Sequence, residues 1–240
     1  LKKTVRWVVG IVLGVYIGTI VLLNIPNIQQ AMSVFVAEEL SEVLNTKVVI
    51  GRINMGLLNR IIIDDVLLDD QSGQEMLKVT RLSAKFDIMP FFKGKISISS
   101  VQLFGFNINL RKETPDSPPN FKFVLDAFAS KDTVKKENSL DLRINSILIR
   151  RGRMSYHVLS EEETPGKFNA KHIQLQNIIA NISLKALSKD SLNLGIKRLS
   201  LDEKASGFSL KKMSLKLVAN NKQTNIDNFT IELPETSLKL

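Results

Sequence analysis

The residues best suited to metal chemistry are two histidines. His157 and His172 are the only histidines among 240 residues, and the chain has no cysteine. A zinc site of the usual type needs three or four clustered nitrogen, sulfur or carboxylate ligands, and the sequence shows no group of residues with that spacing. Both histidines fall in segments patterned as strands. We therefore expect exposed strand histidines, no metal site and no cofactor.

Adjacent carboxylates are the second group with catalytic potential. Asp64-Asp65 and Asp69-Asp70 flank a turn signal at 69–73, and residues 161–163 are three glutamates that precede Thr-Pro-Gly. General acid–base catalysis needs carboxyl groups in a cleft with shifted pKa values. Pairs beside turns are typical of solvated surface residues, which is what we expect here.

Other catalytic and nucleic-acid signatures are missing from the sequence. Gly51 and Gly56 have the spacing of a phosphate loop, but no Lys-Ser or Lys-Thr follows them. The chain has no G-x-S-x-G elbow. Its net charge of +9 comes from basic residues spread along strands without interleaved stacking aromatics, which disfavours nucleic acid. The sequence thus indicates a protein that is not an enzyme.

Residues 5–23 form an apolar run whose only charge is Arg6. A helix of about 20 apolar residues crosses a bilayer core, and an N-terminal cluster of basic residues keeps that end cytoplasmic. A cleaved signal peptide is the alternative, but its apolar core is usually shorter and is followed by small residues. We therefore expect an uncleaved anchor at 1–24. Its topology-setting residues are Lys2, Lys3 and Arg6, and its membrane-facing residues are Trp7, Val8, Val9, Ile11, Val12, Leu13, Tyr16, Ile17, Ile20, Val21, Leu22 and Leu23.

Residues 25–46 have apolar positions at spacings of three and four, which predicts an amphipathic helix. Asn24 is a candidate cap, and Pro26 suits the first turn. The apolar face could lie on the membrane surface or close the end of a sheet. We favour packing against the sheet.

From residue 47 the apolar period changes to two, which predicts a strand-rich domain over 47–240 with one apolar face and one polar face. The alternation slips at Ser99-Ser100 and at Phe104-Gly105, which indicates β-bulges or a bend. A proline-rich loop (113–120), a short helix (121–130) and a polar loop (131–139) interrupt the pattern. Because 235–240 resemble the start of another strand, we expect the domain to be incomplete at its C-terminus. The expected strands are 47–53, 60–68, 76–88, 95–110, 140–149, 153–159, 168–187, 192–201, 208–219 and 226–233.

An ordered series of short motifs behind the anchor resembles the N-terminal region of AsmA-like proteins, in particular the TamB family. The segments that carry the resemblance are IGRI at 50–53, IIDDVLLD at 62–69, PFFKGKI at 90–96, SVQLFGF at 100–106 and PPNFKFVLDAF at 118–128. Each motif is weak alone, and the match covers roughly the first 160 residues.

The resemblance implies a long curved antiparallel sheet that forms an open, chorein-like β-groove with an apolar concave face. It also implies an inner-membrane protein that reaches into the periplasm. Its task would be conducting phospholipid toward the outer membrane, or assisting outer-membrane protein assembly with a barrel partner. A non-catalytic scaffold is a third possibility. Alternation alone fits a closed sandwich equally well, because any apolar face must be covered by something.

The groove hypothesis assigns an inward direction to one set of strand residues. A slip of one residue would turn all of them outward. The candidates are Ile96, Ile98, Val101, Leu103, Ile144, Ile147, Ile173 and Leu175.

Overall fold

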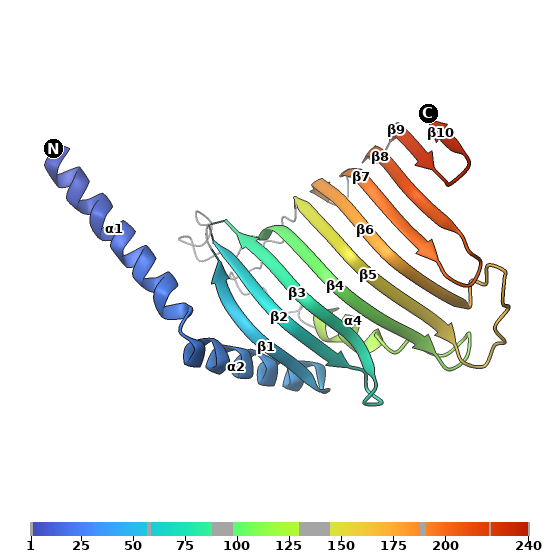
Figure 1. Cartoon of the computed structure of the whole chain (residues 1–240), viewed down its shortest axis with the longest axis horizontal. Coiled ribbons are helices and arrows are strands. Elements are labelled where there is room, and N and C mark those ends of the chain that lie inside the picture. The colour runs from blue at the N-terminus through green and yellow to red at the C-terminus, as the bar shows by residue number, and fades with distance from the viewer. Residues whose placement is uncertain are drawn as a thin grey trace.

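The computed structural model describes residues 2–56, 59–87, 98–129, 145–187, 191–220 and 222–239. It begins with two helices, α1 (Lys2–Leu23) and α2 (Pro26–Leu44). In Figure 1, α1 projects away from the rest of the molecule, whereas α2 lies along the first strand. Four features of the sequence analysis lie outside the described residues. They are the candidate groove residues Ile96 and Ile144, the motif at 90–96 and the polar loop at 131–139.

The rest of the described chain is mainly β, as predicted. A single ten-stranded sheet has its strands side by side in sequence order, and it does not close on itself. A short helix, α4 (Lys122–Ala129), lies between the fourth and fifth strands, where a helix was expected. The strands are β1 (Val48–Gly56), β2 (Arg60–Asp69), β3 (Glu75–Phe86), β4 (Ile98–Lys112), β5 (Ser146–Val158), β6 (His172–Leu187), β7 (Ser191–Glu203), β8 (Ser209–Asn220), β9 (Thr224–Glu232) and β10 (Ser237–Lys239).

One pairing differs from the antiparallel pattern. β4 and β5 run parallel, while every other neighbouring pair is antiparallel. Parallel neighbours need a long crossover, and the connection that contains α4 provides it. The sheet is therefore mixed. The described part of the two strands expected at 140–149 and 153–159 is one continuous strand, β5.

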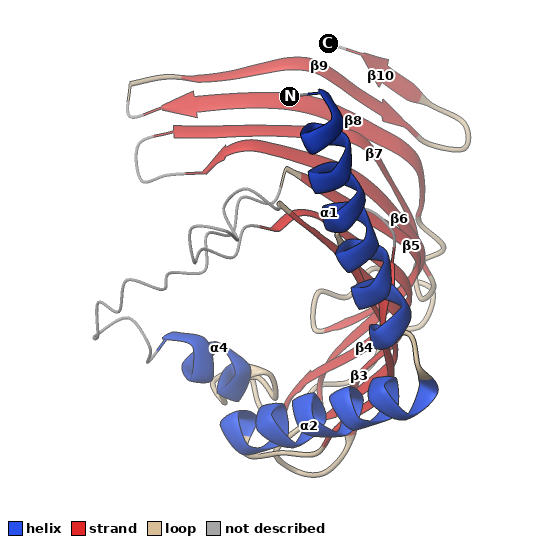
Figure 2. Ribbon diagram, turned by 90° about the vertical axis from the view of Figure 1, so that its left-hand side faces the viewer, coloured by secondary structure: helices blue, strands red, loops and turns tan. Residues whose placement is uncertain are grey.

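The sheet is strongly curved, and both α2 and α4 lie on its concave side (Figures 1 and 2). α2 packs on β1 through Ala37 and Leu44, which join a buried cluster with Val48, Ile50 and Leu68. Phe121, Phe123, Val124 and Ala127 from the α4 region pack against the same cluster. The favoured interpretation of the amphipathic helix, packing against the sheet, is thus confirmed.

The start of α2 differs from the prediction. The cap position is Ile25, which makes no side-chain capping bond, and Pro26 begins the helix. Asn24 instead donates from Nδ2 to the carbonyls of Ile20 (2.7 Å) and Met55 (3.0 Å). Asn24 therefore links the end of α1 to the end of β1.

A row of irregular backbone positions crosses the sheet. Asp65 in β2, Gly105 in β4, Arg151 in β5 and Asn177 in β6 all have positive φ. At this row the inward-facing positions are spaced by three residues, as in Leu103 and Phe106, because the irregularity reverses the alternation. Apolar residues on both sides of the row thereby face the concave side. The predicted slip at Phe104-Gly105 belongs to this row, and the slip at Ser99-Ser100 is a register shift against β3.

Candidate functional site: an apolar groove

The concave face carries an unbroken line of apolar side chains that crosses all ten strands. Each residue in the line is the direct cross-strand partner of the next. Neighbouring strands lie about 4.8 Å apart, so the line extends roughly 40–45 Å. Its members are Ile53, Ile63, Leu82, Leu103, Ile149, Ala180, Leu199, Met213, Ile231 and Leu238.

A second apolar line runs beside the first over eight strands. Cross-strand neighbours on one face of a sheet contact each other directly, so the two lines form a continuous apolar strip. We call this strip the groove. The term includes the residues that lie between and beside the two lines on the same face. The second line consists of Met55, Ile61, Ala84, Val101, Ile147, Ile182, Ile196 and Leu215.

The centre of the groove holds a second buried cluster, separate from the one beside α2. Val79, Phe106 and Ile178 are buried there and pack with half-buried neighbours that include Leu103 and Leu175. None of these three buried residues was among the predicted inward residues. The signal that could have found them is the spacing of three between successive apolar positions, which a strict period of two discards.

The six predicted groove residues within the described chain all lie on this face. Leu103 and Val101 belong to the two lines, and Ile147 pairs with Val101. Leu175 pairs with Met154, and Ile173 pairs with Tyr156. Ile98 pairs with Phe86 beyond the register shift that lies between Ile98 and Ser100. All six are half-buried, so a ligand on the concave face could still contact them.

Within the part of the chain that the structure describes, helices cover the groove at one end. Among the described residues, helices contact the sheet at β1, and the α4 region adds apolar contacts to the same cluster. From β5 to β10 no described helix contacts the sheet. In Figure 2, α2 and α4 lie beside the end of the curved sheet that contains β1 to β4. Alternation left open a closed sandwich or an open groove, and the described part of the chain forms the open one.

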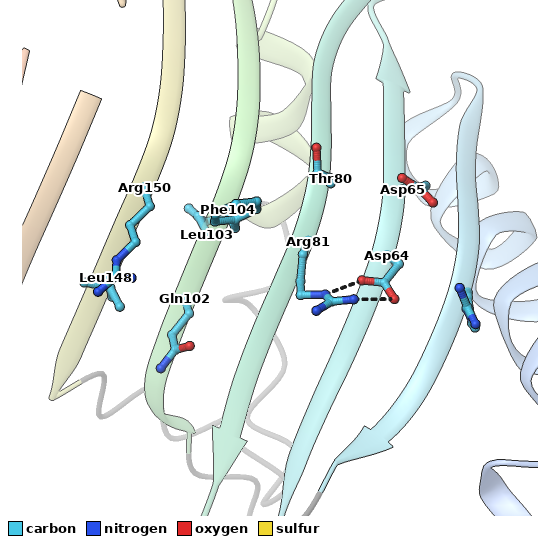
Figure 3. Close-up of a pocket in the computed structure, with 10 residues that line it drawn as sticks. Asp64, Asp65, Thr80, Arg81, Gln102, Leu103, Phe104, Leu148 and Arg150 are labelled. Atoms are coloured by element: carbon cyan, nitrogen blue, oxygen red, sulfur yellow. Dashed lines mark hydrogen bonds and ion pairs between the residues drawn. The ribbon is translucent and has the colours of Figure 1, made fainter. Parts of the chain in front are cut away.

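The opposite, convex face is polar. Gln102 is flanked there by Ser83 and Leu148, and Leu148 pairs in turn with Asn181. A shallow hollow on this face is lined by Arg52, Gln102, Phe104 and Arg150, together with an ion pair between Arg81 Nε and Asp64 Oδ1 at 2.6 Å (Figure 3). The two faces of the sheet therefore differ sharply in chemistry.

The carboxylates expected to be solvated are partly buried. Asp64 is buried and bound by Arg81, and Asp70 is buried with Arg111 Nη2 at 2.6 Å from its Oδ2. Burial alone would raise the pKa of Asp70, but hydrogen bonds from Ser72, Asn120 and Gln74 outweigh it and lower the pKa. The expectation was wrong for these two residues because their cationic partners come from neighbouring strands. Asp65 is exposed, as expected.

Glu203 is a further buried carboxylate, at the turn between β7 and β8. Burial favours its neutral form, but Ser206 Oγ and the backbone N–H groups of Ser206, Ala205 and Gln174 donate to it. These bonds lower the pKa of Glu203 from 4.5 to about 2. Glu203 thus fixes the turn and has no proton to give near neutral pH.

The two histidines are cross-strand partners at the end of β5 and β6 where the loop joins the two strands. The expectation of two exposed histidines was wrong for His172, which is buried. His157 is half-buried. The hairpin register brings the imidazoles together, although 15 positions separate them in the chain.

The N-terminal helix has the character expected of a membrane span. Residues Thr4–Leu23 have a mean hydropathy of 2.1, and none of the helix window is buried against the protein. Trp7 is 75% exposed, and Ile11, Val12, Leu13 and Ile17 are exposed as well. It is the one helix in the described chain long and apolar enough to cross a membrane.

Comparison with known proteins adds no assignment. No family model matches the chain, and no curated protein matches it.

Proposed function

We propose that this chain is a non-catalytic, membrane-anchored conduit whose groove carries the acyl chains of phospholipids between the two membranes of a cell envelope. The observation that carries the proposal is the ten-strand apolar line from Ile53 to Leu238 on the concave face. An apolar strip of this length needs an apolar partner. Among the described residues no second sheet provides one.

The dimensions of the groove suit an acyl chain. One leaflet occupies about half of the roughly 30 Å hydrocarbon core of a bilayer, so an extended acyl chain would cross about three strands. Each buried CH₂ contributes about 0.8 kcal/mol. Because successive strands present similar apolar side chains, an acyl chain could shift from one strand to the next with little change in free energy.

The position of the N-terminal helix supports a groove that begins at the membrane. α1 connects directly to α2, and α2 packs on β1, so the first strand of the groove is the one nearest the membrane-spanning helix. Lys2, Lys3 and Arg6 favour a cytoplasmic N-terminus. The resemblance to TamB and AsmA-like proteins leads to the same arrangement, with an inner-membrane anchor and a periplasmic groove.

Site-specific photo-crosslinking in cells tests the proposal. A photoreactive residue at Leu103, on the concave face, is compared with one at Leu148, on the convex face. The two positions form a matched pair, since both are half-buried leucines on adjacent central strands. We expect labelled phospholipid to be captured at position 103 and not at 148.

Two other outcomes would change the assignment. Capture of only this chain's own residues at position 103 would mean that the groove is filled by protein, and the conduit proposal would fail. Capture of nascent outer-membrane barrel proteins would instead support the alternative of an assembly factor that offers strands to a client.

A further inference from the structure

The loop that joins β5 and β6 brings three potential metal ligands together. His157 lies near the end of β5, just before this loop. Glu163 lies within the loop, and His172 is the first residue of β6 after it. Each offers one ligand atom, and the three atoms lie within 4.8 Å of one another. This cluster has no part in the groove and needs a separate explanation.

The distances between the three atoms match a single bound ion. The two Nδ1 atoms are 3.0 Å apart, and Glu163 Oε1 lies 3.7 Å from Nδ1 of His157 and 4.0 Å from Nδ1 of His172. A triangle with these sides has one in-plane point about 2.1 Å from each corner, which is the usual Zn–N and Zn–O bond length. Rotation of the exposed Glu163 side chain alone could shorten its two distances further.

The protonation of His172 leaves the correct nitrogen free. Its Nε2 lies 2.9 Å from the carbonyl oxygen of Glu161, which can only accept. In the neutral ring Nε2 therefore carries the proton, and Nδ1 has a free lone pair. Metal-bound histidines commonly donate their second ring N–H to a backbone carbonyl in this way. The carboxylate of Glu161 is held by Lys171 Nζ at 2.6 Å, which fixes that carbonyl's loop.

His157 has two available states. Without metal, its Nδ1–H donates to Nδ1 of His172, which accounts for the 3.0 Å contact. With metal, the proton of His157 moves to its own Nε2, and both Nδ1 lone pairs face the ion. No net proton is released, because neither ring changes charge.

The cationic side chains near the cluster are already paired with other groups. Glu162 is exposed in the same loop and is not among the three clustered residues. Arg111 pairs with His157 across β4 and β5, but its guanidinium is bound to Asp70 and Ser72 and so turned away. Lys171 is neutralised by Glu161.

We propose that His157, His172 and Glu163 form a binding site for a divalent first-row transition metal, with Zn²⁺ the best fit to two imidazoles and a carboxylate. Three protein ligands leave a fourth position for water. The ion would join β5, β6 and their loop, and so fix the loop against the end of this hairpin. The site is independent of lipid in the groove.

The test uses the full chain, in detergent and with a purification tag that contains no histidine. Zn²⁺ stoichiometry is measured by elemental analysis after dialysis, and Co²⁺ is added as a spectroscopic probe. We expect one Zn²⁺ per chain, visible absorption bands of four-coordinate Co²⁺ that Zn²⁺ abolishes, and a rise of several degrees in Tm with Zn²⁺.

Variants locate the ligands. His157→Gln or His172→Gln should abolish the Co²⁺ bands, and Glu163→Gln should weaken Zn²⁺ binding by 10-fold or more. Glu162→Gln, an exposed neighbour outside the cluster, should bind as the wild type does. Tm in EDTA shows whether each variant is folded, and His157→Asn replaces any variant that is not. Absence of Zn²⁺ binding at 100 µM by folded wild-type protein, or equal binding by the wild type and the His157 variants, would refute the site.

Discussion

The ring of Phe106 in β4 lies directly over Gly152 in β5, so that a Cβ built on Gly152 would sit 2.4 Å from two of its ring carbons. The contact joins the two parallel strands at the centre of the groove, where Phe106 is buried. Glycine at 152 therefore makes room for the Phe106 ring against the neighbouring strand.

Gly152→Ala should destabilise the protein by about 1–3 kcal/mol, because the backbone or the Phe106 ring must move to admit the methyl group. Urea unfolding followed by circular dichroism measures the loss. In a Phe106→Leu background the same substitution should cost clearly less, since the smaller side chain leaves room. Equal losses in both backgrounds would show that the ring is not the obstacle.

Substitution of Asp65 tests the row of positive-φ residues. Asp65 has a φ of 55°, a conformation that costs β-branched residues more than aspartate or glycine. Asp65→Gly should stay within about 0.5 kcal/mol of the wild type, because relief of strain offsets the added flexibility of the unfolded chain. Asp65→Val should lose about 1–2 kcal/mol. A valine variant as stable as the glycine variant would mean that this strand is regular in solution.

Acid should weaken the turn between β7 and β8. The pKa of Glu203 is about 2 in the folded protein and 4.5 in its ordinary state, so the folded state favours the ionised form. Its contribution, at most about 3 kcal/mol, is complete above pH 4.5 and is lost as the pH falls from 4.5 toward 2.

Unfolding measured from pH 7 to pH 2.5 checks this expectation with Glu203→Gln as the comparison. The wild type should lose stability relative to the variant over the acid range, and the two curves should converge. Parallel curves would assign the acid sensitivity to other carboxylates, such as Asp70.

Asp70 should be far more sensitive to substitution than the residue beside it. It is 2% exposed, binds Arg111, and accepts from Asn120 Nδ2 at 3.1 Å. Asp70→Ala should cost about 2–4 kcal/mol, since it removes a buried hydrogen-bonded carboxylate and leaves the half-buried guanidinium of Arg111 without its partner. Asp69→Ala, the matched control, should cost within about 0.5 kcal/mol. Thermal unfolding of the two variants measures both losses. Similar losses would contradict the proposed role of the ion pair between Asp70 and Arg111.

Much of the fold follows from local pattern. Alternation predicts nearly every strand, and the apolar run at 5–23 predicts the N-terminal helix, because both depend on neighbours in the chain. The reversal near Gly105 is also visible locally, since Leu103 and Phe106 are three apart. The parallel pairing of β4 with β5 is not visible, because strand direction depends on how the crossover through α4 returns to the sheet.

The site depended more on distant partners. Arg81 and Arg111 explain why Asp64 and Asp70 are buried, but their contacts come from strand register and not from sequence spacing. The pairing of His157 with His172 likewise depends on the length of the loop between β5 and β6. Alternation could not decide between a groove and a sandwich, because the strands carry no information on what covers them.

The sequential strand order makes this protein a one-dimensional array. Among the described strands, each pairs only with the strands next to it in sequence. The residues within a strand therefore set the width of the sheet, and the number of strands sets its length. An inserted hairpin would extend the array by about 10 Å and leave the existing rungs in place. A single residue inserted within one strand would instead turn half of that strand inside out. Evolution can thus change the reach of such a chain by duplicating pairs of strands, while the residues within each strand stay under strict constraint.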